Sequence, residues 1–331
     1  MARETGTGKY EQLLARCKDL EPIPTAVVHP CERSALTAAF EATALGLIKP
    51  IYVGPAARIV EVAREASLDL GSSEIVDAPH SHAAAAKAVA LVREGKAELL
   101  MKGSLHTDEL LGAVVARDSG LRTGRRISHA FIIDVPTYHK VLTVTDAAIN
   151  IAPTLEDKVD ICQNAIDLAG AFGLRLPKVA ILAAVETVNS KMPATLDAAA
   201  LCKMAERNQI RGGVLDGPLA FDNAISKEAA RTKGISSPVA GDADILLAPD
   251  LEAGNILAKL LSFLAKADSA GLVLGARVPI ILTSRADSVR SRLASCAVAM
   301  LAAHARRTPE VPLSPRETPS DGPSEASRGL H

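Results

Sequence analysis

Residues 25–54 read TAVVHPCERSALTAAFEATALGLIKPIYVG, a stretch in which two short apolar runs flank a longer Ala-rich segment. The runs at 25–29 and 50–54 are rich in β-branched residues, which is typical of strands. The segment between them, near 32–45, has apolar residues at helical spacing. Two strands separated by a helix form a parallel βαβ unit with the helix on a face of the sheet, so the stretch predicts an α/β fold.

The same alternation recurs along most of the chain. We expect further strands at 98–103, 178–185, 212–217, 244–249 and 278–284, and further helices near 55–67, 107–118, 154–172, 195–207, 252–265 and 287–306. The runs at 129–135 and 141–150 break the rhythm, because the turn PTYH between them is too short for a helical crossover. These two runs should pair antiparallel or cross from one domain to the next.

The length of 331 residues exceeds what one hydrophobic core usually supports, so we expect two domains with a cleft between them. The ends of the chain have a different composition. Residues 1–9 are mostly small and polar, and residues 308–331 hold five prolines among polar residues. We therefore expect a flexible N-terminus at 1–9 and a disordered tail at 308–331 without a catalytic role.

The composition disfavours several classes of function. Lys plus Arg number 37, Asp plus Glu number 38 and aromatic residues make up 2%, so we expect neither nucleic acid nor a membrane surface as partner. The five cysteines are widely spaced without a CxxC pair, which favours reduced thiols over disulfides or a zinc site. With no long apolar run and no signal-peptide core, we expect a cytoplasmic protein.

The stretch ILTSRADSVRSRLA at 281–294 runs from a strand through Ser284 and Arg285 into a helix. Free N–H groups at a helix start attract anions, and an Arg fork supplies paired donors to phosphate or carboxylate. This position therefore predicts an anion site at the carboxyl edge of the sheet. The alternative is that Ser284 or Asp287 caps the helix while Arg285, Arg290 and Arg292 are solvated.

The stretch LLMKGSLHTDEL at 99–110 repeats this architecture. Lys102 and His106 flank a Gly-Ser turn whose N–H groups can approach an oxyanion, and Thr107 is the expected N-cap of the next helix. The alternative is a strand with an exposed Lys before an ordinary capped helix.

Four further features admit two interpretations each. Asn255 lies on an apolar helix face, where it holds either a ligand or an adjacent backbone group. Asp146 follows a strand and serves either a turn or a substrate contact. Asp216 and Asp222 bind Mg²⁺ if the fold brings them together, although a turn role suits Asp216 better. The HSH spacing at 80–82 suggests metal ligands, but helix capping is the stronger interpretation.

No GxGxxG, GxxxxGK[ST] or GxSxG pattern occurs, which disfavours dinucleotide oxidoreductases, ATP-binding kinases and serine hydrolases. From about Tyr10 to Arg306 the chain instead resembles the phosphate acetyl/butyryl transferase family, its butyryl-type branch in particular. The resemblance rests on six ordered blocks: MKGSLHTDELL, TDAAINIAP, AAVETVN, LDGPLAFDNAIS, PVAGDADILLAPDLEAGN and VPIILTSRADS. The chain also looks like the transferase half of bifunctional enoyl-CoA hydratase/phosphate acetyltransferases.

The resemblance implies a two-domain fold similar to isocitrate/isopropylmalate dehydrogenases, with mostly parallel sheets, an interdomain cleft and a homodimer. The first domain would comprise residues 10–143 plus 278–307, and the second residues 144–277. The implied reaction is reversible acyl transfer, acetyl or butyryl, between coenzyme A and phosphate. Coenzyme A and phosphate are then substrates, and neither a permanently bound cofactor nor a metal is expected.

The resemblance also places the site. Ser284 and Arg285 match the Ser-Arg pair that contacts the reacting groups in the acetyl branch. Ser291 stands where that branch has the Asp proposed as the base, so Asp287 becomes the substitute. The substrate-binding residues are expected to be Lys102, Gly103, Ser104, His106, Thr107, Asp146 and Asn255. The alternatives are a metal- and nicotinamide-dependent β-decarboxylating dehydrogenase of the same fold and a non-catalytic acyl-CoA-binding protein.

Overall fold

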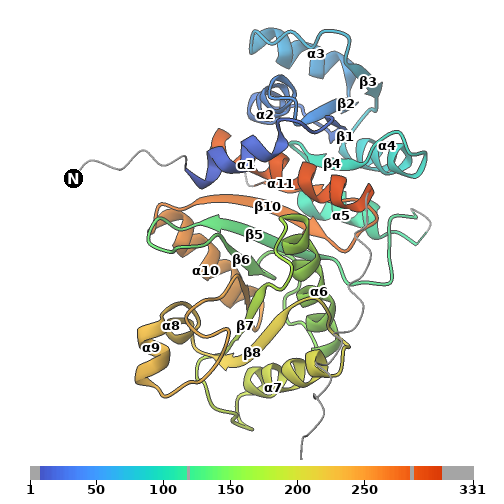
Figure 1. Ribbon diagram of the computed structural model, residues 1–331. Coiled ribbons are helices and arrows are strands. Elements are labelled where there is room, and N and C mark those ends of the chain that lie inside the picture. Colours follow the sequence, from blue (N-terminus) through green and yellow to red (C-terminus); the bar gives the residue numbers. More distant parts are fainter. Residues whose placement is uncertain (1–7, 118–119, 284–286, 308–331) are drawn as a thin grey trace, which may run out of the picture.

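The chain folds around one large mixed sheet with helices on both faces (Figure 1). In this computed structural model, residues 8–117, 120–283 and 287–307 are described. Their strands form a single sheet of eleven strands in the order β3-β2-β1-β4-β11-β10-β5-β6-β9-β7-β8. The predicted α/β class is confirmed. Parallel pairing dominates in each half of the sheet, but antiparallel strands join the halves into one sheet.

The elements of the first half are α1 (Lys9–Cys17), β1 (Ile23–Val28), α2 (Arg33–Ala44), β2 (Ile48–Gly54), α3 (Ala56–Glu65), β3 (Glu74–Asp77), α4 (Ser81–Arg93), β4 (Leu99–Lys102) and α5 (Thr107–Val115). The remaining elements are β5 (Ser128–Asp134), β6 (Leu142–Thr145), α6 (Leu155–Ala171), β7 (Lys178–Leu182), α7 (Pro193–Glu206), β8 (Val214–Leu219), α8 (Phe221–Ile225), α9 (Lys227–Thr232), β9 (Ile245–Leu247), α10 (Leu251–Phe263), β10 (Asp268–Leu274), β11 (Ile280–Ile281) and α11 (Val289–Arg307).

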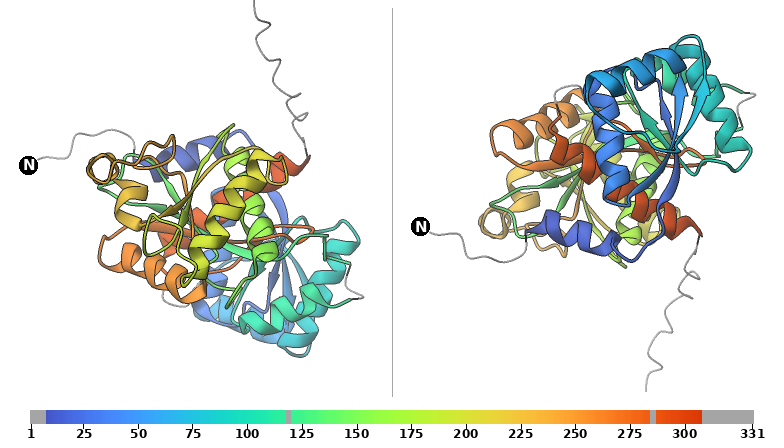
Figure 2. Two further views of the ribbon diagram at one scale, coloured as in Figure 1. Left: turned by 90° about the horizontal axis from the view of Figure 1, so that it is seen from below. Right: turned by 90° about the horizontal axis from the view of Figure 1, so that it is seen from above.

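In the first half, the parallel strands β3-β2-β1-β4-β11 lie between two helical layers (Figure 2). Leu36 of α2, Ile59 of α3 and Met300 of α11 belong to one core cluster. Ala88 of α4 and Leu110 of α5 belong to a second cluster, built on the alternate residues of the same strands. Since successive strand residues point to opposite faces, the two clusters lie on opposite faces of the sheet.

The second half repeats this layering around β6-β9-β7-β8, which are also mutually parallel. Ile161 of α6 and Leu201 of α7 pack on one face. Ala224 of α8, Ala230 of α9 and Leu261 of α10 pack on the other face. The helix predicted at 154–172 is confirmed as α6, and Thr154 caps it by accepting a hydrogen bond from the N–H of Asp157 at 3.2 Å.

The two halves meet at β10 and β5 in the middle of the sheet. β10 is antiparallel to both β11 and β5, and β5 is antiparallel to β6. The predicted antiparallel pairing of the runs at 129–135 and 141–150 is therefore confirmed. The sequence did not predict β10, and this strand reverses the direction of the sheet.

A charged cluster ties the loop between β5 and β6 to the second half. The carboxylate of Asp242 lies within hydrogen-bond distance of three basic side chains: Nε2 of His139 at 2.8 Å, Nζ of Lys140 at 3.0 Å and Nζ of Lys178 at 2.5 Å. Burial alone would raise the pKa of Asp242, but the hydrogen bonds from these three donors outweigh it and lower the pKa. The ionised carboxylate thus stabilises the folded state.

Two expectations concern the chain ends. The flexible segment expected at 1–9 falls outside the described residues except for its last two positions, and there Lys9 begins α1 and pairs with Asp134 at 2.7 Å. The helix therefore begins one residue earlier than predicted. The tail expected at 308–331 lies outside the described residues. No helix in the described ranges has both the length and the hydropathy needed to cross a membrane.

Candidate active site

β4 and β11 are parallel neighbours, with Met101 opposite Ile281. Their carboxyl ends therefore lie side by side at one edge of the sheet, the edge at which open α/β sheets bind ligands. Lys102 and the turn after it follow β4 at this edge, and β11 leads from it toward Ser284 and Arg285. Both of these residues lie outside the described part of the chain.

The turn after β4 is fastened to the end of β1. The N–H of Gly103 donates to the carbonyl oxygen of Val28 at 2.9 Å, and the N–H of Ser104 donates to that of His29 at 3.0 Å. A Cβ on Gly103 would lie 2.3 Å from the Val28 oxygen, so this close approach requires glycine. The two N–H groups that we expected to be oxyanion donors already have partners within the protein.

The hydroxyl of Ser104 also belongs to this turn. Its Oγ donates to the carbonyl oxygen of His29 at 2.7 Å and accepts from the N–H of Cys31 at 2.9 Å. Lys102 is half-buried, with Nζ 3.4 Å from the carbonyl oxygen of Gly103. Ser104 thus joins the ends of β1 and β4, and Lys102 places a cation at their shared edge.

The helix after this turn is capped differently from the prediction. α5 begins at Thr107, so His106 is the N-cap and Thr107 is the first helical residue. The carboxylate of Glu109 accepts from the N–H of His106 at 2.9 Å and from the hydroxyl of Ser81 at 3.0 Å. These hydrogen bonds hold the pKa of Glu109 below its ordinary value. The N-cap is therefore one residue earlier than predicted, and the Glu109 carboxylate satisfies the N–H group of the N-cap residue.

Asp146 lies in a tight turn directly after β6. Its Oδ1 accepts from the N–H groups of Ala148 at 2.9 Å and Ile149 at 3.1 Å, and its Oδ2 accepts from the N–H and side-chain amide of Asn150. Asp146 is 3% exposed, so burial excludes most water from this carboxylate. Of the two predicted interpretations, the structure shows the turn role.

Asn255 holds the same turn from α10. Its Nδ2 donates to the carbonyl oxygen of Ala147 at 2.8 Å, which is the adjacent backbone group that we named as one interpretation. The neighbouring Gly254 allows the helix to approach, because a Cβ there would lie 2.2 Å from the carbonyl oxygen of Asp146.

Lys102 and Asp146 leave the sheet at opposite edges. One cross-strand row contains Met101, Ile281, Leu272, Ala130 and Thr145. β6 runs in the opposite direction to β4. Lys102, the next residue after Met101, therefore lies on one side of this row, and Asp146, the next residue after Thr145, lies on the other side. Four strand steps of about 4.8 Å separate β4 from β6, so the two residues are about 19 Å apart. The structure therefore groups Lys102, Gly103 and Ser104 with β11, but not with Asp146.

The start of α11 accounts for Ser291. The hydroxyl of Ser288 accepts from the N–H of Ser291 at 3.1 Å and contacts its Oγ at 3.1 Å. Ser291 therefore takes part in a helix cap in the place where the acetyl branch has an acid. Asp287 precedes this cap, is half-buried and accepts a hydrogen bond from Nε of Arg292 on its carbonyl oxygen at 3.3 Å.

Of the two arginines in the first turn of α11 that the alternative interpretation described as solvated, Arg290 is exposed but ion-paired, and Arg292 is buried. Arg290 pairs with Asp268 at 2.8 Å and Glu11 at 3.2 Å. Arg292 is buried, and its Nη1 donates to the carbonyl oxygen of Ser34 at 2.9 Å. Both side chains fasten α11 to neighbouring elements.

The predicted metal interpretations find no support. His80 caps α4, with Nδ1 accepting from the N–H of Ala83 at 3.2 Å, as the stronger interpretation predicted. Asp216 accepts from the N–H of Gly217 at 2.9 Å. Within the described ranges, no three His, Cys, Asp or Glu side chains form a group that could hold a metal ion.

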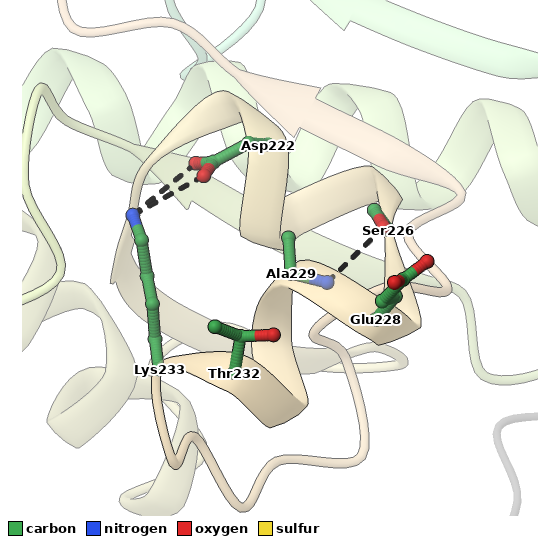
Figure 3. Close-up of a pocket in the computed structure, with 6 residues that line it drawn as sticks. All are labelled: Asp222, Ser226, Glu228, Ala229, Thr232 and Lys233. Atoms are coloured by element: carbon green, nitrogen blue, oxygen red, sulfur yellow. Dashed lines mark hydrogen bonds and ion pairs between the residues drawn. The ribbon is translucent and has the colours of Figure 1, made fainter.

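Asp222 lines a surface cavity of about 370 Å³ on α8 and α9. Figure 3 shows its carboxylate facing Lys233, with 3.2 Å between Oδ2 and Nζ. The helices α8 and α9, which carry this cavity, lie far from β4 (Figure 1). Because a lysine occupies the position that a cation would need, Asp222 is a structural ion-pair partner.

The cysteines lack the properties of a nucleophile. All five are free thiols. Burial raises the pKa of Cys17 to about 11 and of Cys162, Cys202 and Cys296 to about 12. Burial also raises the pKa of Cys31. These thiols remain protonated near neutral pH, where the thiolate is the reactive form.

Two residues beside the site escaped the sequence interpretation. Arg126 donates from Nε to Oδ1 of Asn150 at 2.7 Å and so reaches the Asp146 turn from the start of β5. His129 of β5 is completely buried. The available signal for His129 was one imidazole within an apolar strand, which usually marks a satisfied core residue.

The chain matches known proteins over most of its length. Residues 81–300 match the family profile described as phosphate acetyl/butaryl transferase. A phosphate acetyltransferase of Rhizobium meliloti is 67% identical over 303 residues, covering 92% of this chain and 96% of that protein. A phosphate butyryltransferase of Clostridium beijerinckii is 43% identical over 294 residues, covering 89% and 97%. A branched-chain phosphotransacylase structure from Enterococcus faecalis V583 superimposes with a TM-score of 0.74 at 31% identity, covering 85% of this chain and 99% of that chain.

Proposed function

Because the chain belongs to the phosphate acetyl/butyryl transferase family, we propose that it transfers an acyl group reversibly between coenzyme A and inorganic phosphate. The protein is an acyltransferase, and the dehydrogenase and non-catalytic alternatives are not favoured. The observation that carries the proposal is 67% identity, over 92% of the chain, to a phosphate acetyltransferase. Coenzyme A and phosphate enter as substrates, with no permanently bound cofactor or metal.

Acetyl is the acyl group that we propose. Identity to the named acetyltransferase of Rhizobium meliloti is 67%, against 43% for the butyryltransferase of Clostridium beijerinckii. Turnover of acetyl-CoA should therefore exceed that of butyryl-CoA at equal concentrations.

The proposed reaction takes place at the shared edge of β4 and β11. In the direction from acyl phosphate, the coenzyme A thiolate attacks the acyl carbon, a C–S bond forms, the C–O bond to phosphate breaks and phosphate leaves. Arg285 stabilises the phosphoryl oxygens and Ser284 the tetrahedral oxyanion. Lys102, Gly103, Ser104, His106 and Thr107 form the substrate-binding rim, and Lys102 supplies a second cation there. The proposed roles of Asp146 and Asn255 are indirect, through the turn that they build.

Asp287 is the proposed base that takes the proton of the coenzyme A thiol. A neutral serine hydroxyl is a poor base, so Ser291 does not replace the acid of the acetyl branch, which supports the choice of Asp287. The protonated, buried cysteines support direct transfer in a ternary complex over an acyl-enzyme.

The test is thiol release from acetyl-CoA in phosphate buffer, followed with a thiol reagent and without Mg²⁺ or NAD. Arg285→Ala should lower kcat by about 10² or more, as for loss of a transition-state donor. Arg290→Ala is the matched control, because it removes an arginine from the same segment that pairs with Asp268 and Glu11. Absence of phosphate-dependent release by the wild type, or equal rates for the two variants, would refute the assignment.

We also propose a homodimer that forms through α10. Ile256, Leu260, Phe263 and Leu264 lie on one face of this helix or at its end, and the last two are 71% and 78% exposed. The proposed partner is a second copy, because the surface is complementary to itself. In an antiparallel pairing of two α10 helices, the exposed Glu252 of one copy faces the exposed Lys259 of the other.

Sedimentation velocity tests this surface. Phe263→Asp should shift the protein from dimer to monomer. Val60→Asp, at a position 54% exposed on α3, is the matched control and should leave the mass unchanged. A monomeric wild type, or a dimeric Phe263→Asp variant, would exclude α10 as the interface.

The domain arrangement belongs to the same proposal. We propose domains at 10–143 plus 278–307 and at 144–277, related as in isocitrate/isopropylmalate dehydrogenases, with the substrate in the cleft between them. The core cluster around Ile161 and Leu201 lies wholly within 144–277 and supports the second domain. The other three clusters include residues from both proposed domains. The free cysteines support a reducing compartment such as the cytoplasm.

A further inference from the structure

His29 is the first residue after β1, and its φ of 53° lies in the left-handed region. Three other non-glycine residues in the described part of the chain have a positive φ: Ser67, Asn208 and Lys266. Each of these follows the end of a helix, where a left-handed residue ordinarily terminates the helix. His29 follows a strand instead. A strained residue of this kind persists only where the surrounding structure enforces it, and such residues cluster at functional sites.

Four hydrogen bonds hold the main chain of His29 in this conformation. Its N–H donates to the carbonyl oxygen of Val53 in β2 at 2.6 Å. Its carbonyl oxygen accepts from the N–H and Oγ of Ser104, at 3.0 and 2.7 Å, and from the N–H of Cys31 at 2.9 Å. Glycine adopts a positive φ without steric cost, so these bonds explain the backbone but not the presence of a histidine. The imidazole needs an explanation of its own.

The imidazole of His29 is half-buried, and its Nδ1 is completely buried without a hydrogen-bond partner among the residues that the structure describes. Buried N–H groups without a partner are rarer in proteins than buried acceptors without one, so the ring proton belongs on Nε2. Burial lowers the pKa of His29, against the opposing charges of Glu109 and Glu32, and the ring is therefore neutral at neutral pH. With Nδ1 buried, the exposed part of the ring lies on the Nε2 side and presents one N–H donor.

The strand register places this donor beside a cation. Val28 lies opposite Lys102 in the parallel pair of β1 and β4, so His29 lies beside Gly103 at about the spacing of neighbouring strands, 4.8 Å. Nζ of Lys102 is 3.4 Å from the carbonyl oxygen of Gly103. The two strand ends thus hold an ammonium and a neutral N–H at one edge of the sheet. An anionic oxygen accepts from both kinds of donor, and its hydrogen bonds to charged donors are the stronger ones.

From this geometry we infer that His29 is a phosphate-binding residue, which donates from Nε2 to a phosphoryl oxygen held beside Lys102. The inference rests on the proposed function and deepens it, because it extends the substrate-binding rim from the turn after β4 to the end of β1. It also explains why a histidine stands where the backbone alone favours glycine. The ring then acts on the phosphate substrate, so its loss should affect phosphate more than acetyl-CoA.

The test is the KM of each substrate for His29→Gly. Glycine keeps the left-handed main chain, so this variant should fold, as checked by circular dichroism. Its KM for phosphate should rise about 10-fold to 10²-fold, the effect of losing one hydrogen bond to a charged group, while its KM for acetyl-CoA should change less than about twofold. His29→Gln should recover most of the loss, because its amide nitrogen reaches the position of Nε2. Ser67→Gly is the matched control at an exposed residue with a φ of 55° after α3, and it should leave both KM values unchanged.

The outcomes separate the two levels of inference. A wild type without phosphate-dependent turnover refutes the proposed function itself. An active wild type with a folded His29→Gly variant of unchanged KM for phosphate overturns the role of His29 alone. An equal rise in both KM values also overturns it, because a purely structural role would affect both substrates.

A measurement on the wild type covers the case in which the variants fail to fold. Inorganic phosphate is titrated in the presence of coenzyme A, where no acyl group is available and no turnover occurs. In ¹⁵N NMR spectra the Nε2 signal of His29 should shift, while that of His304, which contacts the carbonyl oxygen of Glu21, should stay in place. An unmoved His29 signal, or a ring proton on Nδ1, would overturn the inference.

Discussion

Gly254→Ala tests the contact that joins α10 to the Asp146 turn. In the interior of a helix, Ala is favoured over Gly by about 0.8–1.0 kcal/mol, so propensity alone predicts stabilisation. The structure predicts the opposite. A Cβ at this position would lie 2.2 Å from the carbonyl oxygen of Asp146, whereas a carbon and a carbonyl oxygen approach to about 3.3 Å. The helix and the turn must therefore separate by about 1 Å.

Overpacking of this kind typically costs about 1–3 kcal/mol. The separation also weakens the 2.8 Å hydrogen bond from Asn255 to Ala147, which is worth about 1 kcal/mol. After the gain in propensity is subtracted, we expect Gly254→Ala to lower the free energy of unfolding by about 1–3 kcal/mol.

The assay is denaturant unfolding followed by circular dichroism, and the matched control is Gly112→Ala. Gly112 lies on the exposed side of α5, with nothing within 4 Å of an added Cβ. The same substitution should therefore stabilise the protein there by up to about 1 kcal/mol. Opposite signs at the two positions support the reasoning. An unfolding midpoint for Gly254→Ala at or above that of the wild type would refute it.

Three further predictions concern charge and thiols. Asp242→Asn should destabilise the protein. The folded-state pKa of this carboxyl is depressed, so its full contribution to the free energy of unfolding is present above the unfolded pKa of about 3.9. The difference in thermal midpoint between variant and wild type, measured from pH 7 to pH 3, should therefore shrink as the pH falls below that value. Asp197→Asn removes the carboxylate that lies 2.6 Å from the buried ammonium of Lys158, and it should lower the free energy of unfolding, measured by urea titration, by about 3–5 kcal/mol. A loss below about 1 kcal/mol would mean that water replaces the carboxylate as partner of the ammonium. In the native protein at pH 7.5, N-ethylmaleimide should modify half-buried Cys31 before buried Cys162, as followed by mass spectrometry. The reverse order would contradict their burial.

Local patterns allowed most of the individual elements to be predicted. The strand-helix-strand unit at 25–54 corresponds to β1, α2 and β2. The helix predicted near 154–172 corresponds to α6, and the structure shows Thr154 accepting the capping hydrogen bond from Asp157. Thr107, which was predicted as an N-cap, is instead the first helical residue. There His106 with Glu109 satisfies the N-terminal groups, and a histidine cap carries a weaker sequence signal than a threonine.

The partners of site residues were harder to predict, because they come from distant parts of the sequence. Ser104 bonds to His29 and Cys31, more than 70 residues away, in an arrangement that depends on β1 and β4 being neighbours. Asn255 was expected to hold a ligand or a backbone group, and the two were indistinguishable until the Asp146 turn was placed beside it. Local sequence specifies which groups need partners, while the strand order determines which partners they find.

The most consequential omission was β10. Its first residues after Asp268 are Ser269, Ala270 and Gly271, which have weak strand propensity, so this segment resembled a loop. In the sheet, however, β10 fits between β11 and β5 because Gly271 leaves room for His129 and for the Leu282 carbonyl. Gly271, which weakened the strand signal, is thus a residue that the central position requires.

That omission also explains why the distance between Lys102 and Asp146 could not be predicted. The expectation that polar residues after each strand gather at one edge holds when all strands run in the same direction. The antiparallel pairings at β10 and between β5 and β6 reverse the direction, so β6 ends at the opposite edge from β4 and β11. Asp146 therefore cannot join Lys102 directly, and any influence of its turn on the Ser284 and Arg285 segment must cross the sheet.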